Sequence, residues 1–126
     1  MWCFHCYDRE YKSWILENTD TLERKHDEFL FPVDRKLFNG DIISSDYQLV
    51  SSVVRMNKFI PGVLVLSGNT YGRNSKGKTL YKCIPDDPKL PVFLVPYVIK
   101  STGFLKKQHD HYVIFELCNW DTKRPI

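Results

Sequence analysis

Residues 61–97 constrain the fold most, because three short apolar runs there are separated by segments rich in glycine and proline. The runs lie at residues 63–66, 80–84 and 92–95. Runs this short, bounded by turn residues and rich in β-branched or aromatic side chains, predict strands rather than helices. Prolines between the second and third runs also interrupt any longer helix. The stretch therefore predicts antiparallel strands joined by turns.

Between the first two runs lies the sequence GRNSKGKT, residues 72–79, which fits the phosphate-loop pattern G-x-x-x-x-G-K-[ST]. In nucleotide hydrolases a helix begins at the Lys-Thr of this pattern, and its N-terminus helps to hold the phosphates. Here Pro85 follows soon after Thr79, and no alternation of strands and helices is visible. The context therefore disfavours a nucleotide hydrolase, although that reading stays an alternative.

The same loop is better interpreted as a basic connection between two antiparallel strands. Gly72 and Gly77 would supply positive φ angles, which glycine adopts without strain. Arg73, Lys76 and Lys78 would then remain in water at the tip of the hairpin.

The rest of the chain also reads as β structure. Residues 2–7 and 11–16 predict a hairpin, residues 48–56 a returning strand, and residues 111–117 a further strand. The pair Asn39-Gly40 is a strong turn signal. Short strands at regular spacing, with turn residues between them, indicate an all-β barrel or sandwich.

Charge is nearly balanced overall, at +3 for 126 residues, but it is unevenly distributed. Residues 1–54 carry ten acidic and six basic side chains, whereas residues 55–107 carry ten basic and two acidic ones. The resulting local net charge of +8 is the size expected of a surface that binds a polyanion. A solvated basic face without a ligand is the alternative.

The length allows one domain or two very small ones, and we expect an intracellular protein that does not enter a membrane. No signal peptide or membrane-spanning run is visible, so the four cysteines are expected to be free thiols. Cys3 and Cys6 form an isolated C-x-x-C pair, for which half-buried thiols are favoured over zinc ligands. The triplet His109-Asp110-His111 is interpreted as a surface loop, since it has no evident third partner.

Three segments, taken together, resemble the cold-shock region of the ribonuclease II/ribonuclease R (RNB) family. The sequence LYKCIPDDPKLPVFLV, residues 80–95, resembles the family's second cold-shock domain, with Asp87, Lys89 and Pro91 at its D-x-R-x-P-like step. Lys89 stands where the family usually has Arg. The strand at residues 111–117 and the sequence NWDTKRP after it are similar to the end of that domain. The sequence LFNGDII, residues 37–43, is similar to the end of the first cold-shock domain. The likeness is greatest to versions encoded by large DNA viruses.

The resemblance implies a mainly β chain with an OB-fold-like antiparallel barrel over residues 58–126 and a partial first cold-shock-like unit over residues 1–57. It further implies an RNA-binding region of a 3′-to-5′ exoribonuclease. The family's metal-binding aspartate cluster, I-D-P-x-x-A-x-D-x-D-D, belongs to a later nuclease domain and is absent here. The resemblance therefore implies no catalytic residue and no cofactor in this chain, with Mg²⁺ expected only in that nuclease domain. We expect the chain to be a fragment or a truncated form of such an enzyme, and not catalytic alone.

A basic barrel face dotted with aromatic residues suits single-stranded RNA, which would be guided toward the nuclease domain. Cationic side chains would follow the phosphates, and aromatic rings would stack on bases. The candidate RNA-binding residues are Lys58, Phe59, Tyr71, Arg73, Lys76, Lys78, Tyr81 and Lys82. Core packing is the alternative role for Tyr71 and Tyr81. The alternative function is a β scaffold that binds a partner protein through its acidic N-terminal half, without binding nucleic acid.

Overall fold

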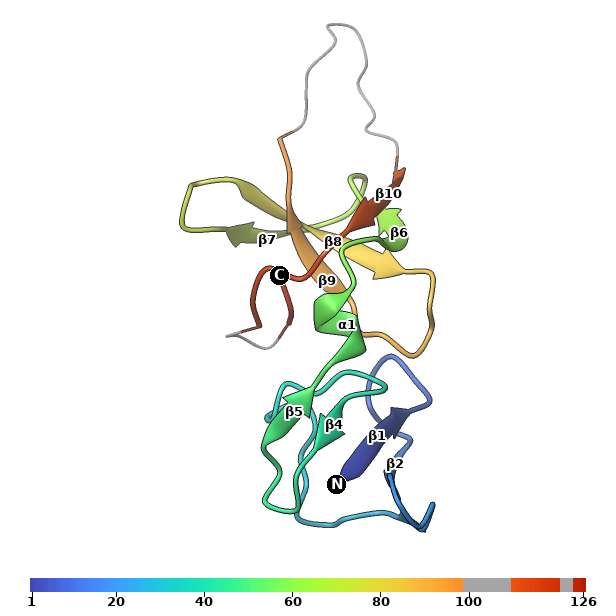
Figure 1. Cartoon of the computed structure of the whole chain (residues 1–126). Coiled ribbons are helices and arrows are strands. Elements are labelled where there is room, and N and C mark those ends of the chain that lie inside the picture. Colours follow the sequence, from blue (N-terminus) through green and yellow to red (C-terminus); the bar gives the residue numbers. More distant parts are fainter. Residues whose placement is uncertain (99–109, 121–123) are drawn as a thin grey trace, which may run out of the picture. The chain divides into compact units, whose positions relative to one another are not determined.

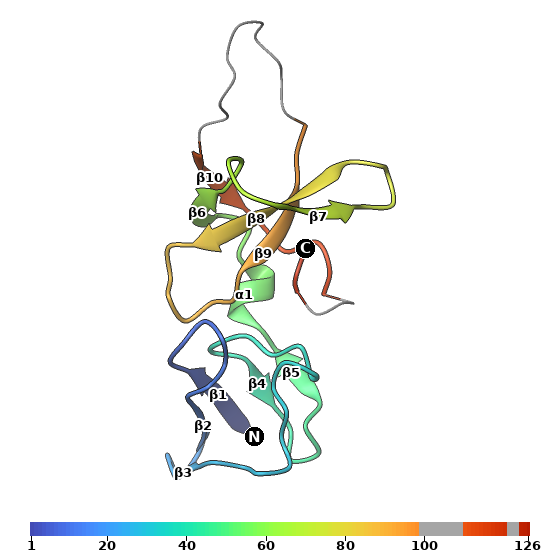
Figure 2. The ribbon, with the colours of Figure 1, turned by 180° about the vertical axis from the view of Figure 1, so that it is seen from behind.

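The computed structural model describes residues 1–98, 110–120 and 124–126. It is mainly β, with two antiparallel sheets, as the sequence predicts (Figures 1 and 2). The chain forms two compact units. The N-terminal unit comprises Met1–Lys58 with Asp87–Pro91, and the C-terminal unit comprises Phe59–Asp86 with Val92–Ile126. In the described part of the chain neither sheet closes on itself, so the structure supports the β class but not a closed barrel.

The N-terminal unit is built on a five-stranded sheet in the order β3-β2-β1-β4-β5. Its central hairpin pairs β1 with β2, and this confirms the hairpin predicted near the N-terminus. Phe4 and Leu16 face each other across the hairpin, and both are fully buried. The strands are β1 (Trp2–Cys6), β2 (Trp14–Asn18), β3 (Arg24–Lys25), β4 (Ile42–Ile43) and β5 (Leu49–Ser51).

The Asn39-Gly40 turn leads into a buried polar cluster at the centre of this unit. Gly40 has a φ of 86°, as its place in a tight turn requires. The following Asp41 is fully buried and accepts hydrogen bonds from the Phe38 backbone amide, the Ser52 hydroxyl and Arg55 Nη1. Burial raises the pKa of the Asp41 carboxyl, although these three donors act to lower it. Asp41 therefore links the turn before β4 to the segment after β5.

The strand predicted over residues 48–56 is wrong in its second half. β5 ends at Ser51, and a short helix, α1 (Val53–Met56), follows it. Ser52 caps α1 by accepting a hydrogen bond from the Arg55 backbone amide, while the Arg55 guanidinium binds Asp41. These long-range bonds to Asp41 override the alternating pattern. None of the helices in the described ranges has the length and apolar character needed to cross a bilayer.

The C-terminal unit is built around β8, which is the longest strand of the described chain. β6 and β7 pair with successive halves of one edge of β8, β9 pairs with the other edge, and β10 returns to pair with β6 (Figure 1). All of these pairs are antiparallel. The strands are β6 (Ile60–Leu64), β7 (Thr70–Arg73), β8 (Thr79–Pro85), β9 (Phe93–Pro96) and β10 (His111–Phe115).

Alternate residues of β8 face the core of the C-terminal unit. Cys83 and Pro85 are fully buried, and the rings of Phe93 and Phe115 meet edge to face at 4.9 Å. Gly62 in β6 makes this packing possible. A Cβ atom there would lie 2.6 Å from the backbone oxygen of Ile84 and 3.0 Å from the Phe115 ring.

The phosphate-loop pattern at residues 72–79 forms the tip of the β7–β8 hairpin. β8 begins at Thr79 and runs antiparallel to β7, so a strand stands where a nucleotide hydrolase has its helix. Gly72 and Gly77 have φ angles of 85° and 78°, which confirms the positive φ angles predicted for them.

Candidate nucleic-acid interface

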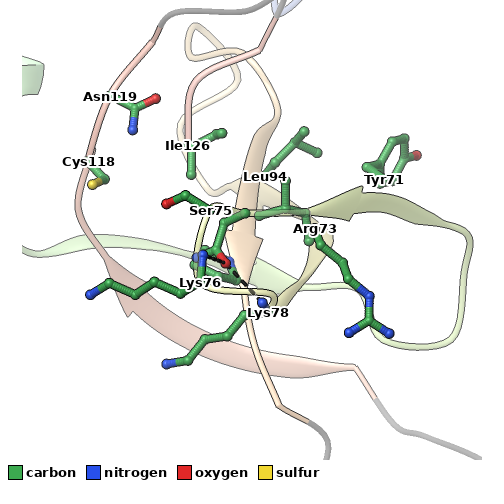
Figure 3. Close-up of a pocket in the computed structure, with 12 residues that line it drawn as sticks. Tyr71, Arg73, Ser75, Lys76, Lys78, Leu94, Cys118, Asn119 and Ile126 are labelled. Carbon is green, nitrogen blue, oxygen red and sulfur yellow. Dashed lines mark hydrogen bonds between the residues drawn. The ribbon is translucent and has the colours of Figure 1, made fainter.

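A groove of about 740 Å³ lies on the C-terminal unit, beside the β7–β8 turn (Figure 3). β8 and β9 form its floor, and residues near the C-terminus form one wall. None of the described residues that line it is acidic, whereas three are cationic. The groove is therefore suited to an anionic ligand. Its lining consists of Tyr71, Arg73, Asn74, Ser75, Lys76, Lys78, Leu80, Leu94, Pro96, Cys118, Asn119 and Ile126.

Asn74 holds the basic turn in shape. Its side-chain oxygen accepts hydrogen bonds from the backbone amides of Lys76, at 3.1 Å, and Lys78, at 2.9 Å. The Asn74 backbone closes the turn by bonding Lys78 and Gly77. Two amides that could otherwise point at a phosphate are thus occupied by Asn74. The turn presents cationic side chains, not the backbone nest of a phosphate loop.

The cations of the turn spread over the rim of the groove. In Figure 3 the side chains of Lys76 and Lys78 extend to one side of the turn, and Arg73 extends to the other. Arg73 Nη1 donates a hydrogen bond to the Gly77 backbone oxygen at 2.9 Å, which holds this guanidinium against the hairpin. Because Lys76 and Lys78 extend away from Arg73, the three cations suit several phosphates of one strand better than a single compact anion.

The floor of the groove is apolar. Leu80 pairs with Pro96 across β8 and β9, and Leu94 pairs with Lys82 two residues along. These residues alternate with the core-facing side chains of the same strands. Leu80 and Leu94 are themselves buried, at 5% and 8% exposed, so only a small part of each meets the groove. The Leu94 backbone amide donates to the Pro125 oxygen at 2.8 Å, which places the C-terminal segment beside β9.

Arg124 belongs to this region, although no sequence signal identified it. Its guanidinium lies over the ring of Tyr71, 5.1 Å from the ring centre, in a cation–π contact. Tyr71 and Arg124 are far apart in the chain, and only the tertiary fold brings them together. The same holds for Asn119, whose backbone pairs with Ile126 in the wall of the groove.

The eight predicted RNA-binding residues fall into two groups. Tyr71, Arg73, Lys76 and Lys78 line the groove together. The other four do not line it. Tyr81 is only 8% exposed and packs edge to face against Tyr97, so a base could not stack on it without rearrangement.

The remaining three lie in β8 or near the start of β6. Lys82 is half-buried in β8, where its backbone oxygen accepts from the Val65 amide. Phe59 is 74% exposed and directly precedes β6. Lys58 is exposed and belongs to the N-terminal unit.

The other sequence candidates have structural roles where the structure describes them. The Cys6 thiol is fully buried and donates to the Asp8 backbone oxygen, while Cys3 is half-buried. Among the described residues, no group of three or more His, Cys, Asp and Glu side chains is placed to hold a metal ion.

Of the His109-Asp110-His111 triplet, His111 begins β10 and Asp110 directly precedes it, while His109 lies outside the described residues. Asp110 accepts hydrogen bonds from the Leu66 amide and from both the amide and hydroxyl of Ser67. These bonds, that of the Ser67 hydroxyl foremost, lower the pKa of the Asp110 carboxyl. Asp110 thus fixes the loop after β6.

No family model matches the chain, and neither the curated proteins nor the solved structures contain a significant match to it.

Proposed function

We propose that this chain binds single-stranded RNA in the groove beside the β7–β8 turn. The observation that carries the proposal is the groove itself, which combines Arg73, Lys76 and Lys78 on its rim with an apolar floor and, among the described residues that line it, no acidic side chain. Single-stranded nucleic acids are bound in this way by many proteins, through a cationic groove that follows the backbone and apolar or aromatic contacts to the bases.

The topology of the C-terminal unit supports an OB-type barrel as the finer description of its fold. The broken strand β6–β7, then β8 and β9, would be the first three strands, and β10 returning to β6 would be the fourth. The bond from the Leu94 amide to Pro125 brings a further segment to the free edge of β9. OB-folds bind oligonucleotides on the face of their second and third strands and beside the first hairpin loop. With the strands assigned in this way, the groove lies on β8 and β9, the second and third strands, beside the first hairpin loop.

The resemblance to the RNB family supplies the wider setting of the proposal. In that setting the groove guides RNA toward a nuclease domain that is not part of this chain, and no catalytic step is assigned to the residues described here. The N-terminal unit would correspond to part of a first cold-shock-like domain.

Binding of a fluorescein-labelled eight-nucleotide oligouridylate, followed by fluorescence anisotropy, tests this function. We expect binding at low salt, weaker binding at high salt, and weaker binding by Lys78→Ala than by Lys12→Ala, which changes an exposed lysine of the N-terminal unit. Absence of binding at low salt would contradict the proposal. ATP hydrolysis that Lys78→Ala abolishes would instead favour the nucleotide-hydrolase alternative.

A partner protein remains the second candidate, because the N-terminal unit exposes large apolar side chains close together in sequence. Phe29 is 83% exposed, Phe31 63% and Val33 39%. Exposed apolar clusters of this kind are typical of protein-binding surfaces. If the oligonucleotide does not bind, this surface becomes the better explanation of the function.

A further inference from the structure

The groove contains more apolar surface than a ligand made only of phosphates would need. Leu80, Leu94 and Pro96 form the floor, and the cations stand at the rim. A linear polyanion bound by charge alone would gain nothing from such a floor, whereas the face of a nucleobase would be desolvated on it. The volume of about 740 Å³ is within the usual range for pockets that bind small molecules.

Tyr71 lines the same groove, and Arg124 contacts the Tyr71 ring. Arg124 lies over the ring of Tyr71, and Tyr71 remains 36% exposed while lining the groove. Guanidinium groups and aromatic rings both stack on nucleobases, and a ring held by a cation loses little freedom when a base binds. Lysine would preserve the charge of Arg124 but not its planar group.

We infer that the groove holds an unstacked nucleobase of the bound strand, with Tyr71 and Arg124 as its stacking surface and Arg73, Lys76 and Lys78 on the neighbouring phosphates. This inference rests on the proposed function and specifies its ligand. The site prefers a strand with accessible bases, of any sequence, over duplexes and simple polyanions. In a duplex the bases are paired and stacked, so none can enter the groove without a cost of opening the helix.

The test measures how tightly the full chain binds two probes that have the same length and the same charge. One is the labelled eight-nucleotide oligouridylate, and the other is an eight-unit abasic oligomer with the same label. We expect the wild-type chain to bind the oligouridylate about tenfold more tightly, which is the effect of one stacked base. Inorganic polyphosphate, added as a competitor, should displace the abasic oligomer more readily than the oligouridylate.

Two variants connect this difference to the stacking pair. Tyr71→Ala should remove most of the tenfold difference, because both probes keep their phosphate contacts but neither can stack. Arg124→Lys should weaken the oligouridylate more than the abasic oligomer. Tyr7→Ala, which removes an exposed tyrosine of the N-terminal unit, is the matched control and should change neither affinity. Circular dichroism of each variant checks that the fold is retained.

The possible outcomes distinguish a failure of this inference from a failure of the proposed function. Equal affinity of the wild-type chain for both probes would overturn the base site and leave phosphate binding intact. Binding of neither probe at low salt would overturn the proposed function itself. An unchanged tenfold difference in a folded Tyr71→Ala chain would show that the base binds elsewhere, and would also overturn the inference.

Discussion

At the scale of single residues, the four cysteines should differ in their reactivity toward thiol reagents. Burial raises the pKa of the Cys83 thiol to about 12 and also raises the pKa of the buried Cys6. Because the thiolate is the reactive form, both should be inert at neutral pH in the folded chain. Cys118 is exposed and lines the groove, so it is accessible to reagents.

A short pulse of iodoacetamide at pH 7.5, analysed by peptide mass spectrometry, should therefore label Cys118 first. Cys6 and Cys83 should react only after denaturation, and Cys3 at an intermediate rate. Oligouridylate should slow labelling of Cys118 if it occupies the groove. Rapid labelling of Cys83 in the folded chain would contradict the described packing, and Cys118→Ser identifies the fast site.

Asp41 is the residue whose loss should most destabilise the N-terminal unit. It is fully buried and pairs with Arg55 at 2.9 Å, so Asp41→Ala leaves a cation and several donors without their acceptor. Removing one partner of a buried ion pair typically costs about 3–5 kcal/mol. Hydrogen exchange of the β1 amides should report this loss as faster exchange.

Asp20→Ala is the control for this change, because Asp20 is exposed. Such surface substitutions usually change the free energy of unfolding by less than about 0.5 kcal/mol. If both variants exchange alike, Asp41 does not have the structural role that its three hydrogen bonds indicate.

At the scale of elements, the approach of β6 to its neighbours depends on Gly62. Gly62→Ala would place a Cβ atom 2.6 Å from the Ile84 backbone oxygen, so β8 or β10 must move. Overpacking of this kind costs about 1–3 kcal/mol. Gly68→Ala is the matched control, because its Cβ would meet only a Val65 methyl at 3.5 Å. Urea denaturation should show a lower midpoint for Gly62→Ala alone, and equal midpoints would refute the tight packing.

Local sequence signals predict some elements well and miss others for a physical reason. The β1–β2 hairpin and β8 follow from alternation and turn residues, which act between near neighbours. The loop expected between the runs at residues 63–66 and 80–84 contains a further strand, β7, that the sequence did not predict. α1 could not be predicted in this way, because its Ser52 cap and Arg55 are held by Asp41, which lies outside the segment. The wrong strand at residues 48–56 shows tertiary hydrogen bonds overriding a local pattern.

The candidate groove was predictable only in the part that comes from one hairpin. Arg73, Lys76 and Lys78 are close in sequence and form a visible basic turn. Asn119 lines the groove, and Arg124 contacts Tyr71, only because the C-terminal segment runs beside β9. Tyr81 is buried in β8, at 8% exposed, which favours the core-packing alternative over stacking for this residue.

At the scale of the whole molecule, the basic bias of the C-terminal half should appear in the salt dependence of binding. If Arg73, Lys76 and Lys78 each neutralise one phosphate of a single strand, the logarithm of the affinity should fall with the logarithm of salt concentration at a slope of about −2.1. The double variant Lys76→Ala/Lys78→Ala should reduce this slope to about −0.7. The double variant Lys12→Ala/Lys89→Ala removes the same charge from exposed lysines of the N-terminal unit and is the control.

Anisotropy titrations of oligouridylate at several salt concentrations distinguish attraction by net charge from contacts at the β7–β8 turn. A slope reduced equally by both double variants would mean that net charge alone attracts RNA, whereas a slope changed only by the first locates the phosphate contacts at the β7–β8 turn.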